Sequence, residues 1–216
     1  MTRLTRKEKQ AHTRRCLMES AAKVFSRRGL AQSSIDEVAE TAGYTKGAFY
    51  ANFANKEELF LAMLDERFAK RIEQIESLAN SAAAPLDRAR RAGEDFTSFV
   101  KSDPEWERLF FEFAAHAARN EDFRVELVTR YRALRKAIAG VLGDHAKEAG
   151  MKPPFPSETI ALMTFAMANG AALEHLLEPD DIPDDLFSSM LIVFFAGLKA
   201  LSGIEVEPLR DVPTPA

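Results

Sequence analysis

The sequence predicts an all-α protein of about nine helices, with a three-helix unit of the helix-turn-helix type at its amino terminus and a larger helical body behind it. Apolar residues recur at helical spacing along almost the whole chain. Glycine, proline and capping residues such as Ser, Thr, Asp and Asn separate these stretches. No segment shows the alternation of apolar and polar residues that is typical of a strand.

Residues 13–28 form the first predicted helix. Leu17, Ala21 and Phe25 recur at spacings of four residues, so they line one face of a helix whose other face is charged. Gly29 follows directly, and glycine accepts the left-handed backbone conformation that ends many helices. The helix is therefore expected to end at residue 28.

The next two helices are short and closely spaced. Ser34 can cap the first, because its hydroxyl can accept from the free N–H groups of the opening turn, and Glu37 can reach back to complete a capping box. Gly43 allows the tight turn that follows, and Thr45 can cap the second helix. The expected core of the three-helix unit consists of Leu17, Ala21, Phe25, Ile35, Val38, Ala39, Phe49 and Phe53.

The rest of the chain predicts six longer helices. Asn55, Asp103 and Asn120 are candidate caps, and Pro104 suits the first position of a helix. A proline-rich linker at residues 152–156 separates the last two helices from the others. The expected helices cover residues 56–79, 86–101, 104–119, 120–149, 157–177 and 184–201.

Charge is distributed unevenly along the chain. Residues 1–56 contain 11 Lys and Arg against 5 Asp and Glu, whereas the remainder contains 18 against 28. We therefore predict a basic helix-turn-helix domain (1–56), an acidic helical domain (57–203) and a flexible tail (204–216). Concentrated positive charge attracts the phosphates of nucleic acid whatever its base sequence, although basic termini are also common as solvated tails.

The composition is that expected of a cytoplasmic protein. Cys16 is the only cysteine, so no disulfide can form within the chain, and the amino terminus lacks the apolar run of a secretory signal. The longest uncharged apolar stretches are residues 159–173 and 186–198, and both are shorter than the ~20 residues that span a bilayer. No membrane association is expected.

Three segments together resemble the TetR family of transcriptional regulators: AAKVFSRRGL, SIDEVAETAGYTKGAFYANF and NKEELF. The resemblance covers Thr13 to about Leu64 at matching spacing. A lone helix-turn-helix pattern would be weak evidence, but this combination is specific. It implies a DNA-binding transcriptional regulator whose second short helix enters the major groove of double-stranded DNA.

The predicted DNA contacts lie at the start of each short helix and along the second one. Lys46 can reach a guanine edge or a phosphate, and the Tyr50 hydroxyl can reach a phosphate, although Tyr50 can also be an ordinary packed aromatic. Ala48 stands where related proteins often have Thr or Ser, so one phosphate hydrogen bond is expected to be absent. The resemblance implies contacts at Ser34, Lys46, Tyr50 and Lys56. The full predicted set is Ser33, Ser34, Tyr44, Thr45, Lys46, Gly47, Tyr50, Asn52 and Lys56.

The resemblance also implies a pocket for a small, largely apolar effector inside the body. Such pockets are lined mostly by apolar side chains with a few polar anchors, and methionine adapts to varied shapes. Each of the candidate aromatic residues can equally be ordinary core. The candidates are Phe96, Phe99, Trp106, Phe110, Phe113, His116, Tyr131, Met163 and Met167.

No pattern in the sequence indicates an enzyme, a metal site or a cofactor. The four histidines lie on different segments, and neither a phosphate-binding glycine loop nor a nucleophile motif is present. Glu112 and His116 share one helix face, but two such groups without further ligands are more typical of a surface contact than of a metal site.

The last two helices are apolar around much of their circumference. This pattern fits either a deep core within one chain or a four-helix interface between two subunits. The resemblance implies the second arrangement, and hence a homodimer.

We therefore expect a homodimeric, ligand-responsive repressor that leaves a near-palindromic operator when its effector binds. Two other classes stay open at this point. One is a helical enzyme, or a small-molecule or lipid carrier, with an accessory basic head. The other is an architectural DNA-binding protein that responds to no ligand.

Overall fold

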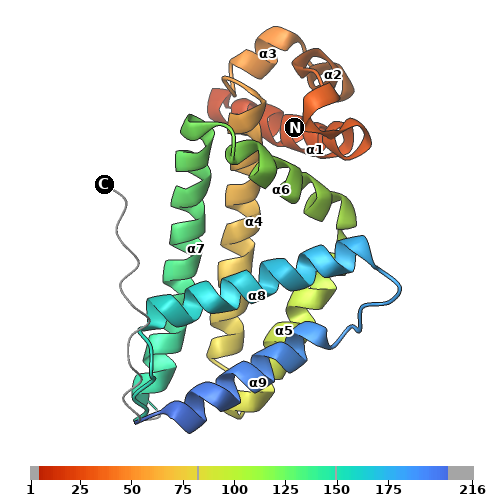
Figure 1. The fold of residues 1–216 in the computed structure, drawn as a ribbon. Helices are drawn as coiled ribbons and strands as arrows, with labels where there is room; N and C mark the ends of the chain where they lie inside the picture. Colours follow the sequence, from red (N-terminus) through yellow and green to blue (C-terminus); the bar gives the residue numbers. More distant parts are fainter. Residues whose placement is uncertain (1–4, 82, 149, 204–216) are drawn as a thin grey trace. The chain divides into compact units, whose positions relative to one another are not determined.

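The computed structural model describes residues 5–81, 83–148 and 150–203, which are helical apart from short connections (Figure 1). The all-α prediction, with a helix-turn-helix at the amino terminus and about nine helices, is confirmed for these residues. The predicted tail, residues 204–216, lies outside them. The helices are α1 (Arg6–Gln32), α2 (Ile35–Thr41), α3 (Lys46–Tyr50), α4 (Lys56–Ala79), α5 (Pro85–Ser102), α6 (Pro104–Ala117), α7 (Glu121–Glu148), α8 (Ser157–Leu177) and α9 (Leu186–Leu201).

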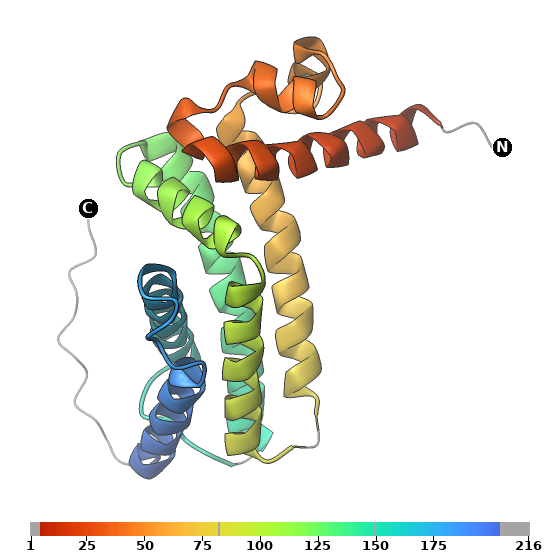
Figure 2. The same cartoon turned by 90° about the vertical axis from the view of Figure 1, so that its right-hand side faces the viewer.

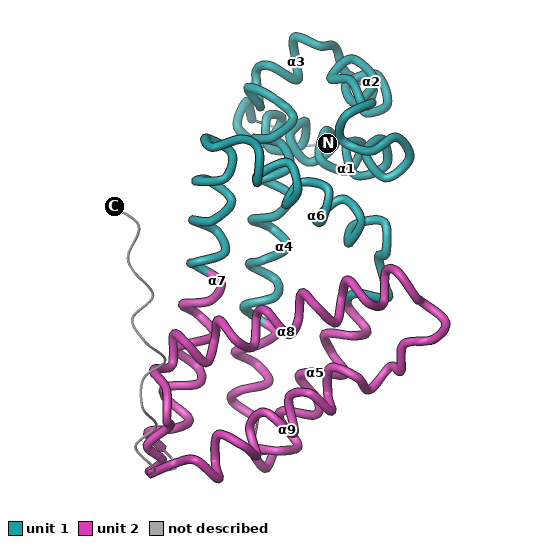
Figure 3. The backbone as a smooth tube through the Cα atoms, viewed as in Figure 1, with its two compact units in different colours: residues 1–73, 100–133 teal, residues 74–99, 134–216 magenta. Residues whose placement is uncertain are grey.

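The chain forms two compact units, which have different colours in Figure 3. The first consists of residues 1–73 and 100–133, and the second of residues 74–99 and 134–216. Both α4 and α7 contribute residues to each unit. The predicted domain boundary at residue 56 lies inside the first unit, and the division into 1–56 and 57–203 stays a prediction.

Phe113 of α6 is the centre of the first unit's core. Its ring stacks on Phe60 of α4 with 3.6 Å between centroids, and it meets Phe25 of α1 edge-on at 6.1 Å. Phe123 of α7 lies 5.6 Å away on another side. One buried ring therefore joins four helices, three of which are distant in sequence from α1. The core predicted for the three-helix unit is also confirmed, although Ile35 is only partly buried.

The helix starts follow the predicted caps. Asn55, Asp103 and Asn120 each accept a hydrogen bond from the backbone N–H three residues further on, at 2.7, 3.1 and 3.0 Å. Pro104 occupies the first helical position after Asp103. These side chains satisfy N–H groups that the helix itself leaves without partners.

Helix α1 is longer than predicted, because it begins at Arg6 rather than at residue 13. Thr5 and Glu8 form a capping box: the Thr5 N–H donates to Glu8 Oε2 at 2.6 Å, and the Glu8 N–H donates to Thr5 Oγ1 at 3.3 Å. The amino-terminal half of α1 projects past α2 and α3 (Figure 2). At the other end, Gly29 has a φ of 73° and interrupts the helical backbone where the sequence predicted an end.

The second unit has a separate apolar core. Phe187 and Leu191 of α9 pack with Ala89 of α5 and Ala171 of α8. Helix α5 approaches α9 so closely at Gly93 that a Cβ atom there would lie 2.4 Å from the backbone of α9. Glycine at this position therefore sets the distance between the two helices.

Helix α8 differs from its prediction in one respect. It is 21 residues long, and among the described residues it has the length and the composition that crossing a membrane requires. The expectation that this apolar segment is too short is therefore wrong, because the helix continues past the uncharged stretch at both ends. Only 28% of its most apolar window is buried. Much of its apolar surface is therefore left uncovered by this chain.

Candidate nucleic-acid interface

Ser34 starts the helix-turn-helix as predicted. Its hydroxyl accepts a hydrogen bond from the Glu37 N–H at 3.1 Å. The predicted return contact from the Glu37 side chain is wrong, because its carboxylate instead lies 2.8 Å from the Arg28 guanidinium. A charged guanidinium binds a carboxylate more strongly than a neutral backbone N–H does.

A tight turn aims α3 outward. Gly43 adopts a φ of 76°, which a residue with a side chain rarely adopts, and the next N–H, that of Tyr44, donates to the Ala39 carbonyl at 2.9 Å. Thr45 then caps α3 by accepting from the Ala48 N–H at 3.2 Å. The backbone on both sides of the turn is thus held by hydrogen bonds that the local sequence predicts.

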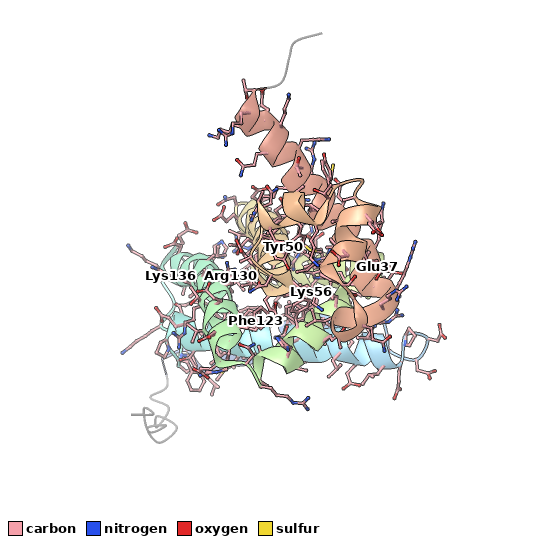
Figure 4. The ribbon with its side chains drawn as sticks, turned by 90° about the horizontal axis from the view of Figure 1, so that it is seen from above. Glu37, Tyr50, Lys56, Phe123, Arg130 and Lys136 are labelled. Carbon is pink, nitrogen blue, oxygen red and sulfur yellow. The ribbon has the colours of Figure 1, made fainter. Side chains whose placement is uncertain are left out.

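Helix α3 has one buried side and one exposed side. Phe49 is fully buried, and Phe53 just after the helix is 1% exposed, so these two rings anchor it to the core. Tyr50 is 52% exposed, with its ring edge against Phe49 at 5.6 Å. The exposed members of the predicted set on this side are Thr45, Lys46, Gly47 and Tyr50, with Tyr44 half-buried beside them. Figure 4 shows this side of the molecule from above, with Tyr50, Glu37 and Lys56 labelled.

Lys46 forms an exposed ion pair. Its Nζ lies 3.0 Å from Asp36 Oδ2 of α2, and both side chains are about half exposed. The hydrogen bond to Asp36 raises the pKa of Lys46, so the ammonium is fully charged at neutral pH. Water and salt weaken a pair of this kind, and a phosphate or a base edge can therefore replace the aspartate.

Two other predicted contacts point inward. Ser33 is 5% exposed, and its hydroxyl donates to the Gly29 carbonyl at the end of α1. The Asn52 amide donates back to the Ala48 carbonyl at 2.8 Å, and its oxygen is buried. Both side chains thus hold the backbone of the helix-turn-helix, through the Ser33 hydroxyl and one amide N–H of Asn52.

Lys56 also has a structural contact that the sequence did not reveal. Its Nζ donates to the carbonyl oxygens of Leu30 at 2.6 Å and Ser33 at 2.8 Å. These carbonyls lie at the carboxyl end of α1, where a cation is favourable because the helix leaves its last C=O groups without partners. One N–H of the ammonium is left for another acceptor.

Two residues outside the predicted DNA-contact set hold α1. Arg14 donates to the Asn52 carbonyl at 2.9 Å and lies over the Phe53 ring, 4.1 Å from its centroid. Glu112 of α6 accepts from the Leu30 N–H at 2.7 Å. Neither contact could be found from local sequence, because the partners are 38 and 82 positions apart.

The predicted effector-binding residues are divided between the two units. In the first unit, Trp106, Phe110 and Phe113 are buried in the core, Tyr131 stacks on Phe110 at 5.9 Å, and His116 Nε2 lies 3.2 Å from Glu57 Oε1. Those in the second unit are Phe96, Phe99, Met163 and Met167. The packing of the buried aromatics agrees with the core alternative, and their role in a pocket stays a prediction.

A hollow of about 640 Å³ in the second unit differs from the predicted pocket in both place and polarity. None of the nine predicted residues lines it. Its lining includes the histidine His145 and the charged residues Glu76, Arg88, Asp144 and Glu148. Arg88 Nη1 and His145 Nε2 lie 3.3 Å apart, and both contact the Ala79 carbonyl at the end of α4.

A short capped helix, exposed on one side and anchored by buried aromatics on the other, defines a helix-turn-helix DNA-binding protein. Residues 17–63 match the family of bacterial regulatory proteins of the tetR type, and residues 85–196, more than half of the chain, match the carboxyl-terminal domain of BetI-type transcriptional repressors. The chain belongs to the TetR family of transcriptional regulators, so it is a DNA-binding regulator and not an enzyme.

Full-length relatives agree with this assignment. The regulator TtgR of Pseudomonas putida is 28% identical over 191 residues, which cover 84% of this chain and 88% of TtgR. The repressor AcnR of Corynebacterium efficiens is 24% identical over 186 residues, covering 81% and 92%. The solved structure of FadR from Bacillus subtilis in complex with stearoyl-CoA has a TM-score of 0.71 at 16% identity, covers 89% and 99% of the two chains, and shows the shared fold.

Proposed function

We propose that the protein is a cytoplasmic homodimeric repressor that binds a near-palindromic operator and is released by a small, largely apolar effector. The observation that carries the proposal is the two-sided helix α3, which presents Lys46 and Tyr50 outward while Phe49 is buried. Membership of the TetR family supports DNA binding, and the repressor AcnR among the relatives supports the direction of control.

In the proposed complex α3 enters the major groove. Thr45, Lys46 and Gly47 form its first turn, which in this class of motif contacts base edges. Ser34 and Tyr50 reach flanking phosphates, and these contacts set the register on the duplex rather than the sequence. Ser33, Asn52 and Lys56 support this surface by hydrogen bonds to the backbone of the helix-turn-helix. The remaining N–H of Lys56 is available to a phosphate.

The proposed dimer interface is the uncovered apolar side of α8 and α9. Leu177 and Val193 are 66% and 72% exposed, which is unusual for such side chains. Small residues on the same sides allow close helix approach, and four helices from two subunits can bury them together. The exposed apolar or small residues are Leu162, Ala166, Gly170, Leu173 and Leu177 on α8, and Val193, Ala196, Gly197, Ala200 and Leu201 on α9.

The proposed effector is small and largely apolar. FadR, which shares the fold, was solved with stearoyl-CoA, a ligand with a long acyl chain. The aromatic and methionine side chains predicted from the sequence are of the type that lines such a pocket. The effector releases DNA if it binds better to a conformation in which the two α3 helices are misplaced, and it can shift the equilibrium only by that difference in affinity.

Replacement of Lys46 tests base reading directly. A duplex should first be selected from a random pool with the wild-type protein, and binding of Lys46→Ala should be measured on that duplex and on random-sequence duplex over a range of salt concentrations. We expect a loss of about tenfold or more on the selected duplex, and on random DNA only the smaller loss of about one phosphate contact. Lys70→Ala removes the same charge from the exposed surface of α4 and should bind like wild type. Equal losses of Lys46→Ala on both duplexes would exclude base reading by Lys46.

The effector part of the proposal has a separate test. Stearoyl-CoA and a panel of uncharged aromatic and aliphatic compounds should be screened for a rise in melting temperature, because a ligand that binds only the folded state stabilises it. Each compound that raises it should then be added to the protein bound to the selected duplex. Stabilisation together with release of DNA supports the proposal, whereas stabilisation without release contradicts control by that compound.

A further inference from the structure

The first turns of α1 carry basic side chains that pack on no core. Residues 5–12 are all exposed, yet the helix begins at Arg6 and is fixed there by the capping box of Thr5 and Glu8. Burial therefore does not explain why the helix extends this far. From residue 5 to residue 15 the only acidic side chain is that of Glu8, and the basic ones are Arg6, Lys7, Lys9, Arg14 and Arg15.

Helical spacing places part of this charge on the side of α1 that faces the helix-turn-helix. Arg14 reaches the segment after α3, with its hydrogen bond to the Asn52 carbonyl at 2.9 Å. Lys7 and Gln10 lie seven and four residues before Arg14, so they share its side of the helix. Arg6 precedes Lys7 and lies about 80° around the helix from Arg14. We call Arg6, Lys7 and Arg14 the basic ridge. Figures 2 and 4 show that this half of α1 continues beyond α2 and α3.

Helix stability does not account for the basic ridge either. Arg6 and Lys7 occupy the first two helical positions, where the helix dipole favours anions and disfavours cations. Glu8 already supplies the favourable carboxylate and accepts from the backbone at this end. The capping box therefore explains where α1 begins, but it does not explain the cationic side chains of Arg6 and Lys7.

We propose that the basic ridge binds phosphates of duplex DNA outside the base pairs that α3 reads. This inference rests on the proposed function and extends its contact surface. Arg6 lies about 12 Å along the helix axis from Arg14, since each residue advances the helix by 1.5 Å. Successive phosphates of one DNA strand advance about 3.4 Å along the duplex axis, so a ridge that lies along this axis spans roughly three to four base pairs. The charge of the ridge complements the phosphates of DNA of any sequence. The ridge therefore adds to the affinity for DNA and to its salt dependence, but not to sequence specificity.

The test uses the selected duplex in two lengths, one limited to the base pairs whose sequence the selection defines and one with ten further base pairs on each side. Affinity is measured by fluorescence anisotropy from 50 to 250 mM KCl for wild type, for the double variant Arg6→Gln/Lys7→Gln and for the control Lys9→Gln/Arg15→Gln. The control removes the same charge from the same end of α1, and Lys9 and Arg15 lie about 140° and about 100° around the helix from Arg14. Both variants keep Thr5 and Glu8, and circular dichroism should show unchanged helicity.

We expect wild type to bind the longer duplex more tightly and with a steeper salt dependence. Arg6→Gln/Lys7→Gln should lose that gain, and its salt slope should fall by about two for each subunit, whereas the control should retain both. Equal losses in the two double variants would overturn the inference, because they would indicate attraction by net charge without a defined ridge. No loss in either would also overturn it, and reading by α3 would stand if Lys46→Ala still binds weakly. Failure to select any duplex would refute the proposed function itself.

Discussion

Gly29 offers the sharpest test of how α1 is held in the first unit. Its backbone has φ 73° and ψ 171°, a combination that is almost exclusive to glycine. A Cβ atom there would lie 2.9 Å from Glu112 Oε1, the oxygen that accepts from the Leu30 N–H. Gly29→Ala therefore strains the backbone and also pushes away the carboxylate that holds the next residue. The carboxylate can move, because it is the end of a flexible side chain, but moving it breaks that hydrogen bond.

The size of the effect follows from these two causes. Backbone strain of this kind costs about 1–3 kcal/mol. Loss of a hydrogen bond to a charged group costs about 1.5–3 kcal/mol, and the lower end applies because the contact is only partly buried. Gly29→Ala should therefore lower the free energy of unfolding by roughly 3–4 kcal/mol. Gly43→Ala is the matched control, because φ is 76° there but no heavy atom lies within 4 Å of the new Cβ, so only about 1–2 kcal/mol is expected.

Urea unfolding followed by circular dichroism measures both variants, together with Glu112→Ala and the double variant Gly29→Ala/Glu112→Ala. Because Gly29→Ala and Glu112→Ala disrupt the same hydrogen bond, their effects should fall short of additivity by about 1 kcal/mol or more. Equal destabilisation by Gly29→Ala and Gly43→Ala, with additive behaviour in the double variant, would refute this account of the contact.

Two further predictions concern a buried carboxyl and the proposed dimer. Burial raises the pKa of Glu107 from 4.5 to about 7, although Arg67 lies 3.8 Å away. The folded state therefore resists ionisation of this carboxyl. Between pH 4.5 and pH 7 the free energy of unfolding should fall by at most roughly 3 kcal/mol relative to that of Glu107→Gln. Urea melts of both proteins at pH 5 and pH 7.5 measure this, and a difference that does not change with pH would contradict it. Val193→Glu places a charge on the exposed apolar side of α9 and should halve the mass measured by sedimentation. Lys199→Glu, about 120° around the helix, should leave the mass unchanged. An unchanged mass for Val193→Glu would exclude the exposed side of α9 as the dimer interface.

The parts of the fold that the sequence predicted well depend on neighbours along the chain. Ser34, Gly43 and Thr45 act within four residues of their own positions, so caps and turn could be assigned from spacing alone. The same holds for the buried side of α3, because Phe49 and Phe53 are one helical turn apart. The start of α1 was also visible in principle, since Thr5 and Glu8 have the spacing of a capping box.

The contacts that were predicted wrongly or missed connect distant positions. The sequence predicts that Lys56 contacts DNA, and it did not reveal that the same ammonium also binds carbonyls 23 and 26 residues earlier. Glu37 had a local partner available and instead pairs with Arg28 of another helix. Spacing along the chain also cannot separate core residues from pocket residues. It places Phe110 and Phe113 on one face of a helix, but it does not say whether a protein side chain or a ligand covers that face.

One turn of α6 connects the two segments that flank the helix-turn-helix. Glu112 accepts from the Leu30 N–H at the end of α1, and His116, four residues on, lies 3.2 Å from Glu57 in the first turn of α4. Glu112 therefore anchors the end of α1 within the first unit, and His116 lies against the start of α4. A hydrogen bond of 2.7 Å tolerates a displacement of well under 1 Å before it weakens. A shift of α6 by about 1 Å must then either break the hydrogen bond to Leu30 or carry the end of α1 with it. Under the proposed function, an effector that moves α6 can therefore displace the end of α1, which leads into α2, without touching α3.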